Sequence, residues 1–441
     1  MPDDGFVQFN KHIIEYMRGV YVLLLISLLG YTGRVSGQES VTITQCYEWA
    51  RANYPQIHQM GLIDQTERYS LSNVGKAWLP QLSVSGKASY QSDVTKLPLD
   101  GDKISSLLPG FEIPSLSKDQ YQVVAQVDQT IWDGGSTRSA RALTRAEAIA
   151  NREQLESELY VLNDRVNQIY FGCLLQDELI RQNALLQKEL QVNIEPMMEN
   201  GVANQSDLES MEVELLNARQ NEIELKASRT VYRQMLATFI NKPLTDQVVL
   251  KTPESPERSL STQINRPELR ALDAKSEWIE TQNKQVTAGL MPRIGAFVQG
   301  GYGRPGLNML EDSFEPYYVA GVRLSWNLGK LYTLKNDRRK IEVSRRQIDV
   351  QRETFLFNTR LQLLRQNTEI KKMTDLMRAD DDIIRLRTSI KQAAEVKLEN
   401  GVISVTDLIR EINAEDMARQ TAAAHRVQRL MTIYNYMYTT N

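Results

Sequence analysis

The chain has 441 residues, a formal net charge of −3 and 24% charged residues, a length that would suit two or three ordinary domains. The balanced charge argues against a nucleic-acid-binding protein, which needs a basic surface. Two Cys and three widely spaced His form no metal spacing and offer no obvious catalytic base. We therefore expect no metal, no cofactor and no enzymatic activity. Cys46 and Cys173 fit one disulfide in an exported protein and two buried thiols about equally well.

The first 37 residues read as a secretory signal peptide. Met17-Arg18 precedes an apolar run, Val20 to Leu29, that is too short to span a membrane as a helix. Small residues at 35–37 predict cleavage there, and either Met1 or Met17 is the start. No later stretch has the length and apolarity of a transmembrane helix, so we expect any membrane insertion to use strands.

A short motif occurs twice, 200 residues apart, between long helical patterns. Glu-Asn-Gly-Val stands at 199–202 and at 399–402, and Ser/Thr-Asp-Leu follows at 206–208 and 406–408. Asn-Gly ends a helix because both residues tolerate the left-handed conformation. We expect Ser206 or Thr406 to cap the helix that follows. Each copy therefore predicts the tip of a helical hairpin.

The two halves also share strands before each hairpin. A helical segment lies between prolines 25 residues apart in each half, and two stretches of alternating apolar and polar residues follow it. The alternation covers 81–91, 121–132, 293–302 and 318–326, with polar loops at 92–120 and 303–316. Soluble two-helix coiled coils with incidental alternation would not explain four such stretches placed symmetrically.

Each half then continues into a helix of about 60 residues, roughly 90 Å long, and a shorter helix returns from the tip. The returning helices cover 206–241 and 406–438, with apolar residues at helical spacing. The chain thus divides into the signal peptide at 1–37, a first repeat at 38–241, an equatorial connector at 242–264, and a second repeat at 265–441.

The alternating strands suit an outer membrane. Strands of about ten residues with one apolar face can place that face against lipid. Aromatic residues flank them as membrane-interface rings do: Tyr90, Tyr121, Trp132, Tyr302, Tyr318 and Trp326. Four strands cannot close a barrel, and open edges in lipid leave backbone groups unpaired. Other copies of the chain must therefore complete it.

On these features the chain resembles the TolC family of outer-membrane efflux channels. The duplicated unit, the two Gly-Val-x-x-x-Ser/Thr-Asp-Leu tips and the strand-to-helix joints carry the resemblance, which covers about 40–438. The joints are Ile131-Trp132-Asp133-Gly134-Gly135 and Ser325-Trp326-Asn327-Leu328-Gly329. The motifs are individually weak, and their order and double occurrence are the strong signal.

The resemblance implies a membrane α+β fold: a trimeric twelve-strand outer-membrane β-barrel that continues into a long periplasmic α-helical barrel. It implies a passive, gated export duct of a tripartite efflux or type I secretion system in a Gram-negative bacterium, most of the chain lying in the periplasm. The expected partners are two further copies, a periplasmic adaptor, an inner-membrane transporter and outer-membrane lipid, without nucleic acid. Drugs, metal ions and proteins all remain open as cargo. The alternative function is a non-conducting outer-membrane scaffold or adhesin.

The resemblance also points to site residues at the tips. By position, Asp207 and Asp407 match entrance acids that select cations, although acids at helix N-termini also simply favour the helix dipole. Arg410 stands where the family usually has a further acid, and it can contact Asp407 instead. The expected adaptor-docking residues also stop helices: Asn200, Gly201, Val202, Asn400, Gly401 and Val402.

Three other patterns carry less information about function. The acidic cluster 380–382 reads as a solvated helix face, and the basic run at 335–346 reads as a solvated face or a contact with lipid phosphates or the tunnel. The glycine pattern at 301–306 leads into a Pro-containing loop and not a helix, which excludes a dinucleotide site.

Overall fold

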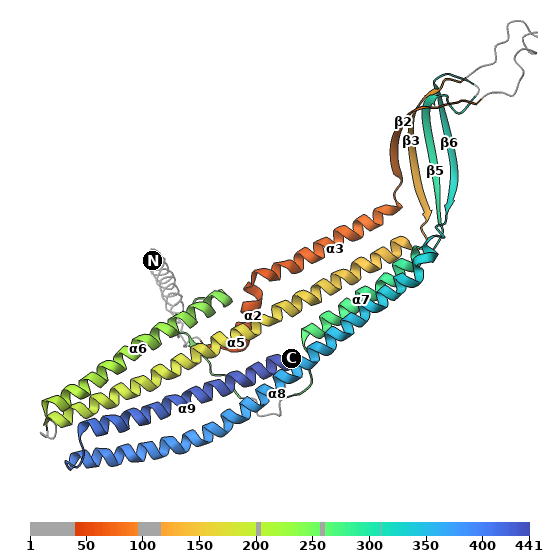
Figure 1. Ribbon diagram of the computed structural model, residues 1–441. Helices are drawn as coiled ribbons and strands as arrows, with labels where there is room; N and C mark the ends of the chain where they lie inside the picture. Colours follow the sequence, from red (N-terminus) through yellow and green to blue (C-terminus); the bar gives the residue numbers. More distant parts are fainter. Residues whose placement is uncertain (1–39, 96–115, 200–203, 256–260, 310) are drawn as a thin grey trace, which may run out of the picture.

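The computed structural model describes residues 40–95, 116–199, 204–255, 261–309 and 311–441. The molecule is elongated, with a four-stranded sheet at one end and long helices that run away from it (Figure 1). The predicted signal peptide, most of the loop 92–120 and the first hairpin tip, with Asn200, Gly201 and Val202, lie outside the described residues.

The predicted strands form one antiparallel sheet in the order β2-β3-β5-β6. Its members are β2 Gln81–Tyr90, β3 Asp119–Trp132, β5 Arg293–Arg304 and β6 Glu315–Ser325. The register places Leu82, Val127 and Val298 side by side on one face, where they are 72%, 37% and 54% exposed. One face of the sheet is thus apolar and uncovered in a single chain.

The strand bounds differ from the sequence prediction by one to three residues, and one strand contains a bulge. β6 ends at Ser325, so Trp326 lies beyond the ladder, where its indole nitrogen donates a hydrogen bond to the Leu290 carbonyl at 2.9 Å. In β3 a bulge between Thr130 and Trp132 leaves Ile131 unpaired and sets Trp132 opposite Ile294. The prediction assumed strict alternation to the end of the strand, whereas the extra residue of a bulge reverses the face of the residues after it.

The helices follow the predicted plan in both halves. The first set is α2 Ile43–Asn53, η1 Pro55–His58, α3 Gln59–Gly75, η2 Lys76–Trp78, α5 Ser136–Glu199 and α6 Gln205–Ile240. The second set is α7 Pro267–Ala288, α8 Lys330–Glu399 and α9 Val405–Thr440. The long helices have 64 and 70 residues, which confirms two long hairpins. Among the described helices, each lacks the length or the apolarity needed to cross a membrane.

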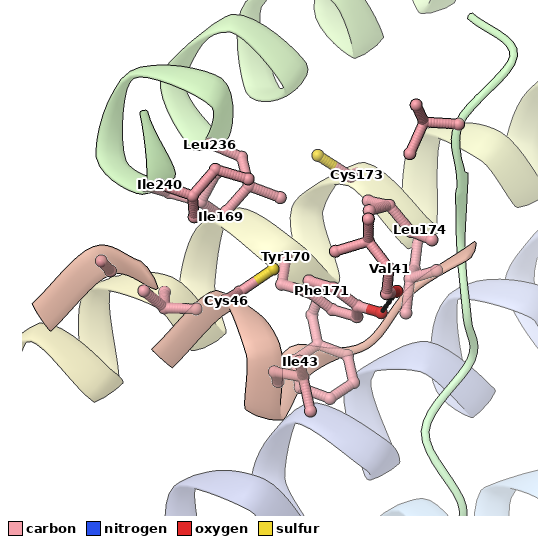
Figure 2. Close-up of a cluster of buried hydrophobic side chains, with 14 residues drawn as sticks. Val41, Ile43, Cys46, Ile169, Tyr170, Phe171, Cys173, Leu174, Leu236 and Ile240 are labelled. Atoms are coloured by element: carbon pink, nitrogen blue, oxygen red, sulfur yellow. Dashed lines mark hydrogen bonds between the residues drawn. The ribbon is translucent and has the colours of Figure 1, made fainter. Parts of the chain in front are cut away.

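The largest core lies at the middle of α5, where the connector crosses it (Figure 2). Here β1 Ser40–Val41 pairs in parallel with β4 Val249–Leu250, a small sheet that the sequence did not predict. The Tyr170 hydroxyl lies 2.9 Å from the Val41 carbonyl and 2.7 Å from that of Lys251. The fully buried tyrosine thereby ties the beginning of the first repeat to the connector.

The two cysteines are free and buried in this core, so the disulfide alternative is wrong. Burial raises the pKa of both thiols to about 12. They act as small apolar side chains and remain protonated at neutral pH.

The acidic cluster at 380–382 is only partly the solvated face that the sequence predicted. Asp381 and Asp382 are exposed, but Asp380 is buried and its carboxylate lies 2.8 Å from Nδ1 of His425 on α9. That interpretation is therefore wrong for Asp380. The basic run after β6 is exposed, and Arg345 pairs with Glu280 of α7 at 2.8 Å.

Gly172 provides a test of the α5–α6 packing. A Cβ at this position would lie 2.5 Å from Cε1 of the Tyr232 ring, which has little freedom to move. We expect Gly172→Ala to lower the free energy of unfolding by about 1–3 kcal/mol, measured by thermal or denaturant unfolding. The matched control is Gly61→Ala in α3, where nothing lies within 4 Å and alanine should be neutral or stabilising. Equal effects of the two substitutions would contradict this packing.

Candidate channel entrance

The tip of the second hairpin is a tight, fully hydrogen-bonded turn. Gly401 has a φ of +68°, which closes α8 with a hydrogen bond from Val402 N to Lys397 O at 2.9 Å and one from Gly401 N to Leu398 O at 2.9 Å. This is the Schellman pattern that glycine favours. The Val402 side chain is 69% exposed at the turn. The predicted helix stop at Asn400-Gly401 is confirmed.

The caps of the returning helices differ from the prediction. Asn204 caps α6 and Ser404 caps α9, two residues before the predicted Ser206 and Thr406, which were wrong. The two predicted entrance acids complete these caps. Asp207 N donates to Asn204 Oδ1 at 3.0 Å, and Asp407 N donates to Ser404 Oγ at 3.2 Å. Each carboxylate accepts a hydrogen bond from the backbone N–H of its cap residue in return, at 3.1 Å.

The cap and Arg410 also set the charge of Asp407. Hydrogen bonds from the side chain and backbone of Ser404 lower the pKa of this carboxyl, and the nearby Arg410 adds to the effect. Arg410 Nη1 lies 3.5 Å from Asp407 Oδ1, which is the contact that the sequence suggested. Asp407 is therefore ionised at neutral pH, and its Oδ2 atom is engaged in the capping box of α9.

Above the tips one core joins the two hairpins. It is built from apolar residues of α5, α6, α8 and α9: Leu186, Leu190, Met211, Leu215, Ala218, Ala394, Leu398, Val405, Leu408, Ile409 and Ile412. Movement of one hairpin against the other must therefore disturb this shared core.

A buried ionic network lies directly above this core. Glu415 of α9 is 1% exposed, and its carboxylate accepts from Thr388 Oγ1 at 2.5 Å and lies 2.8 Å from Lys391 Nζ. Lys391 also pairs with Glu189 of α5. Burial alone would raise the pKa of Glu415, but hydrogen bonds from Lys391, Thr388 and Arg419 lower it to about 2. Lys391 thus forms an ionic link between the second hairpin and α5.

An acidic groove of about 480 Å³ borders the network between α5, α8 and α9. Its walls include Glu189, Glu395 and Asp416. Burial raises the pKa of Asp416 to about 6 and also raises that of Glu395. The ionised forms of Asp416 and Glu395 are therefore less stable here than in water. Within the described residues, no group of acids, His or Cys is arranged to hold a metal ion.

The sequence reasoning missed this network, although a signal for it exists. Leu408, Ile412, Glu415 and Ala422 recur at helical spacing and all are buried, so Glu415 interrupts an apolar seam. A charged residue at such a seam position needs a buried partner.

The predicted interface aromatics all lie on the sheet or at its ends and are exposed. Their exposed fractions run from 41% for Trp132 to 80% for Tyr318, with Tyr90, Tyr121, Tyr302 and Trp326 between them. Tyr90, Tyr121 and Tyr302 lie at the end of the sheet that bears the loops, and the tryptophans lie at the helical end.

The described fold is shared with solved outer-membrane channels. The outer-membrane channel OprN is 14% identical with a TM-score of 0.63, and the match covers 90% of this chain and 89% of that chain. CusC is 14% identical, with a TM-score of 0.62 and coverage of 90% and 92%. The open-state MtrE channel of Neisseria gonorrhoeae is 14% identical, with a TM-score of 0.60 and coverage of 90% and 88%. No curated protein sequence matches the chain.

The chain therefore has the fold of outer-membrane channels with a long helical part. Residues 46–242 match the family of outer membrane efflux proteins. This match covers just under half of the chain and confirms the resemblance seen in its sequence. The predicted localisation is confirmed with it: the outer membrane of a Gram-negative bacterium, with a large helical part in the periplasm. The family and the structural neighbours are channels and not enzymes.

Removing the Glu415 carboxylate should destabilise the protein. Glu415→Ala leaves Lys391 buried with only Glu189, and breaking one partner of a buried ion pair costs about 3–5 kcal/mol. Thermal unfolding at pH 7 measures the loss. Asp382→Ala, an exposed acid paired with Arg385 at 3.1 Å, is the control and should change stability by less than about 1 kcal/mol. The loss of stability caused by Glu415→Ala should shrink as the pH falls from 4.5, the ordinary pKa of the carboxyl, toward the folded pKa of about 2. In that range the stabilisation by the Glu415 carboxylate is lost from the unmodified protein as well.

Asp416→Asn should have the opposite effect and stabilise the protein. A folded pKa of about 6, raised from 3.8, means that the carboxylate destabilises the fold above pH 6 and ceases to do so as the pH falls toward 3.8. We expect the amide to stabilise the protein by about 1 kcal/mol at pH 8, since partial exposure screens the charge, and by little at pH 4. Melting temperatures at both pH values test this. A gain that is equal at the two values would rule out the carboxylate as its source.

Proposed function

We propose that the protein is a passive, gated export duct, formed by three copies that share one twelve-strand barrel in the outer membrane and one helical tunnel across the periplasm. The observation that carries the proposal is the four-stranded sheet with an uncovered apolar face and two open edges, β2 and β6. In lipid the apolar face is stable, whereas the unpaired edge groups are not. Pairing β2 of one copy with β6 of the next removes both edges.

The helical layer supports the same arrangement. Its order is α6, α5, α9, α8, so that α6 and α8 form its edges (Figure 1). Both edge helices carry exposed apolar side chains. They include Val213, Leu216, Ile223 and Val231 on α6, and Val343, Val350, Phe357, Leu361 and Leu364 on α8. Neighbouring copies would cover these stripes as the seam of a helix pair does.

The gate in this proposal is the second hairpin. Its opening shifts α8 and α9 away from α5, which breaks the pairing of Lys391 with Glu189 but keeps the contact between Lys391 and Glu415. Asp207 and Asp407, three copies of each, would form the acidic entrance, with Arg410 tempering Asp407. The turns at 200–202 and 400–402 would receive a periplasmic adaptor.

The family match supports the proposed protein partners of the duct. Channels of this family are homotrimers that work with an adaptor and an inner-membrane pump. We infer a tripartite efflux or type I secretion assembly, with the energy supplied by the inner-membrane transporter. The equatorial connector would form a band around the tunnel, held by the β1–β4 pair.

Single-channel conductance of the mature protein in a planar bilayer tests the function. We expect small, cation-preferring openings, and we expect Asp207→Ala/Asp407→Ala to lose cation preference because the entrance charge is removed. Asp381→Ala/Asp382→Ala removes two exposed acids far from the tips and serves as the control.

The outcomes of these measurements separate the duct, its acidic entrance and its gate. Unchanged selectivity in a conducting double variant would keep the duct and reject the acidic entrance. Folded oligomers that never conduct in either form would favour the alternative, a non-conducting scaffold or adhesin that displays the loop 92–120. Openings that grow in Lys391→Met would support the proposed gate, and openings unaffected by it would count against that gate.

A further inference from the structure

A basic cleft lies where the sheet meets the helices. It has a volume of about 1040 Å³ and is formed by the β3–α5 joint, η2 and α7. Three arginines of α5 line it at helical spacing, Arg138, Arg141 and Arg145, and Lys284 faces them from α7. Trp78 and Trp132 line its upper end. The cleft thus combines four cations with two indoles.

The strand register shows on which side this cleft opens. Trp132 pairs with Ile294, which pairs with Leu324, a residue of the apolar face that is 67% exposed. Directly paired residues point to the same face of a sheet. The bulge at Ile131 therefore turns Trp132 to the apolar face, and the cleft below it opens on the side that would meet lipid.

The cations of the cleft form no ion pair with a carboxylate of the described residues. Among the described residues, no acid lies within ion-pair distance of the three arginines or of Lys284. The single acid in the lining, Asp133, is buried and already accepts hydrogen bonds from Gly135 N at 2.9 Å and Thr137 N at 2.6 Å. Its carboxylate completes the beginning of α5 and leaves the arginines free for an outside anion.

We propose that this cleft binds the phosphate of an anionic phospholipid headgroup from the periplasmic leaflet of the outer membrane. The inference rests on the proposed insertion of the sheet in that membrane. Guanidinium groups bind phosphate oxygens in a planar, two-pronged geometry, and basic residues near an anionic surface add electrostatic attraction. The indoles lie at the level where tryptophan favours the membrane interface, with the acyl chains continuing along the apolar face.

The test uses the full-length protein in neutral detergent, with phosphatidylglycerol retained on the oligomer measured by native mass spectrometry. The cleft variant is Arg138→Gln/Arg141→Gln/Arg145→Gln. The control, Arg338→Gln/Arg339→Gln/Lys340→Gln, removes three exposed positive charges of α8 that do not line the cleft. We expect the cleft variant to bind phosphatidylglycerol about tenfold more weakly, with the control unchanged. Phosphatidylcholine should bind more weakly than phosphatidylglycerol to the unmodified protein.

Each contrary outcome overturns the proposal. Equal loss in the control variant would mean diffuse attraction by surface charge. Competition by inorganic phosphate at the same concentration would identify a small-anion site without a role for the lipid. Unchanged retention in a cleft variant with the size of the native oligomer would exclude the cleft altogether. Conductance of the same samples distinguishes the two proposals. A protein that conducts without lipid selectivity would reject only the lipid site. A protein that binds lipid selectively but never conducts would reject only the duct.

Discussion

Side-chain packing along one helix, α5, holds the molecule together. A helix of 64 residues cannot bury an apolar stripe by itself, and α5 contacts α2, α3, α6, α7 and α9 along its length. Phe171 and Tyr170 lie at the centre of these contacts, and the ring of Tyr434 on α9 packs at a tilt against Phe171, with 5.5 Å between ring centroids. The sheet at one end and the hairpin tips at the other are positioned by this single axis.

The sequence predicted the repeated hairpins and strands but missed the contacts between parts of the chain that lie far apart in sequence. The hairpin at Asn400-Gly401 and the period-two strands were recognisable because turn chemistry and alternation are local signals. The β1–β4 pair was not, because two residues per strand leave no periodic trace and their partners lie about 200 positions apart. Glu415 itself interrupts an apolar seam, but its partners could not be predicted, since Glu189 and Lys391 meet only through the tertiary fold. The cap residues were misplaced by two positions, which is the usual error at a helix boundary.

Charges serve two different purposes in the helical part. Asp207 and Asp407 lie at the surface and are engaged in capping boxes, so they stabilise the turns whatever else they do. Glu415 is buried and depends on Lys391 and Arg419 to remain ionised. A change of pH between 5 and 8 leaves Asp407 and Glu415 charged, whereas Asp416 in the neighbouring groove takes up a proton in that range. The groove is thus more sensitive to mild acid than the entrance itself.

The parallel pairing of β1 with β4 has a consequence for how the chain is made. Synthesis proceeds from the N-terminus, so Ser40 and Val41 appear long before Val249 and Leu250, and Tyr434 of the same core appears last. The first hairpin can form early from local contacts, but its central core stays incomplete until nearly the whole chain has emerged. A nascent chain therefore exposes the surroundings of Tyr170 and Phe171 throughout its elongation, and this stretch of α5 is where an escorting chaperone would find an apolar surface to hold.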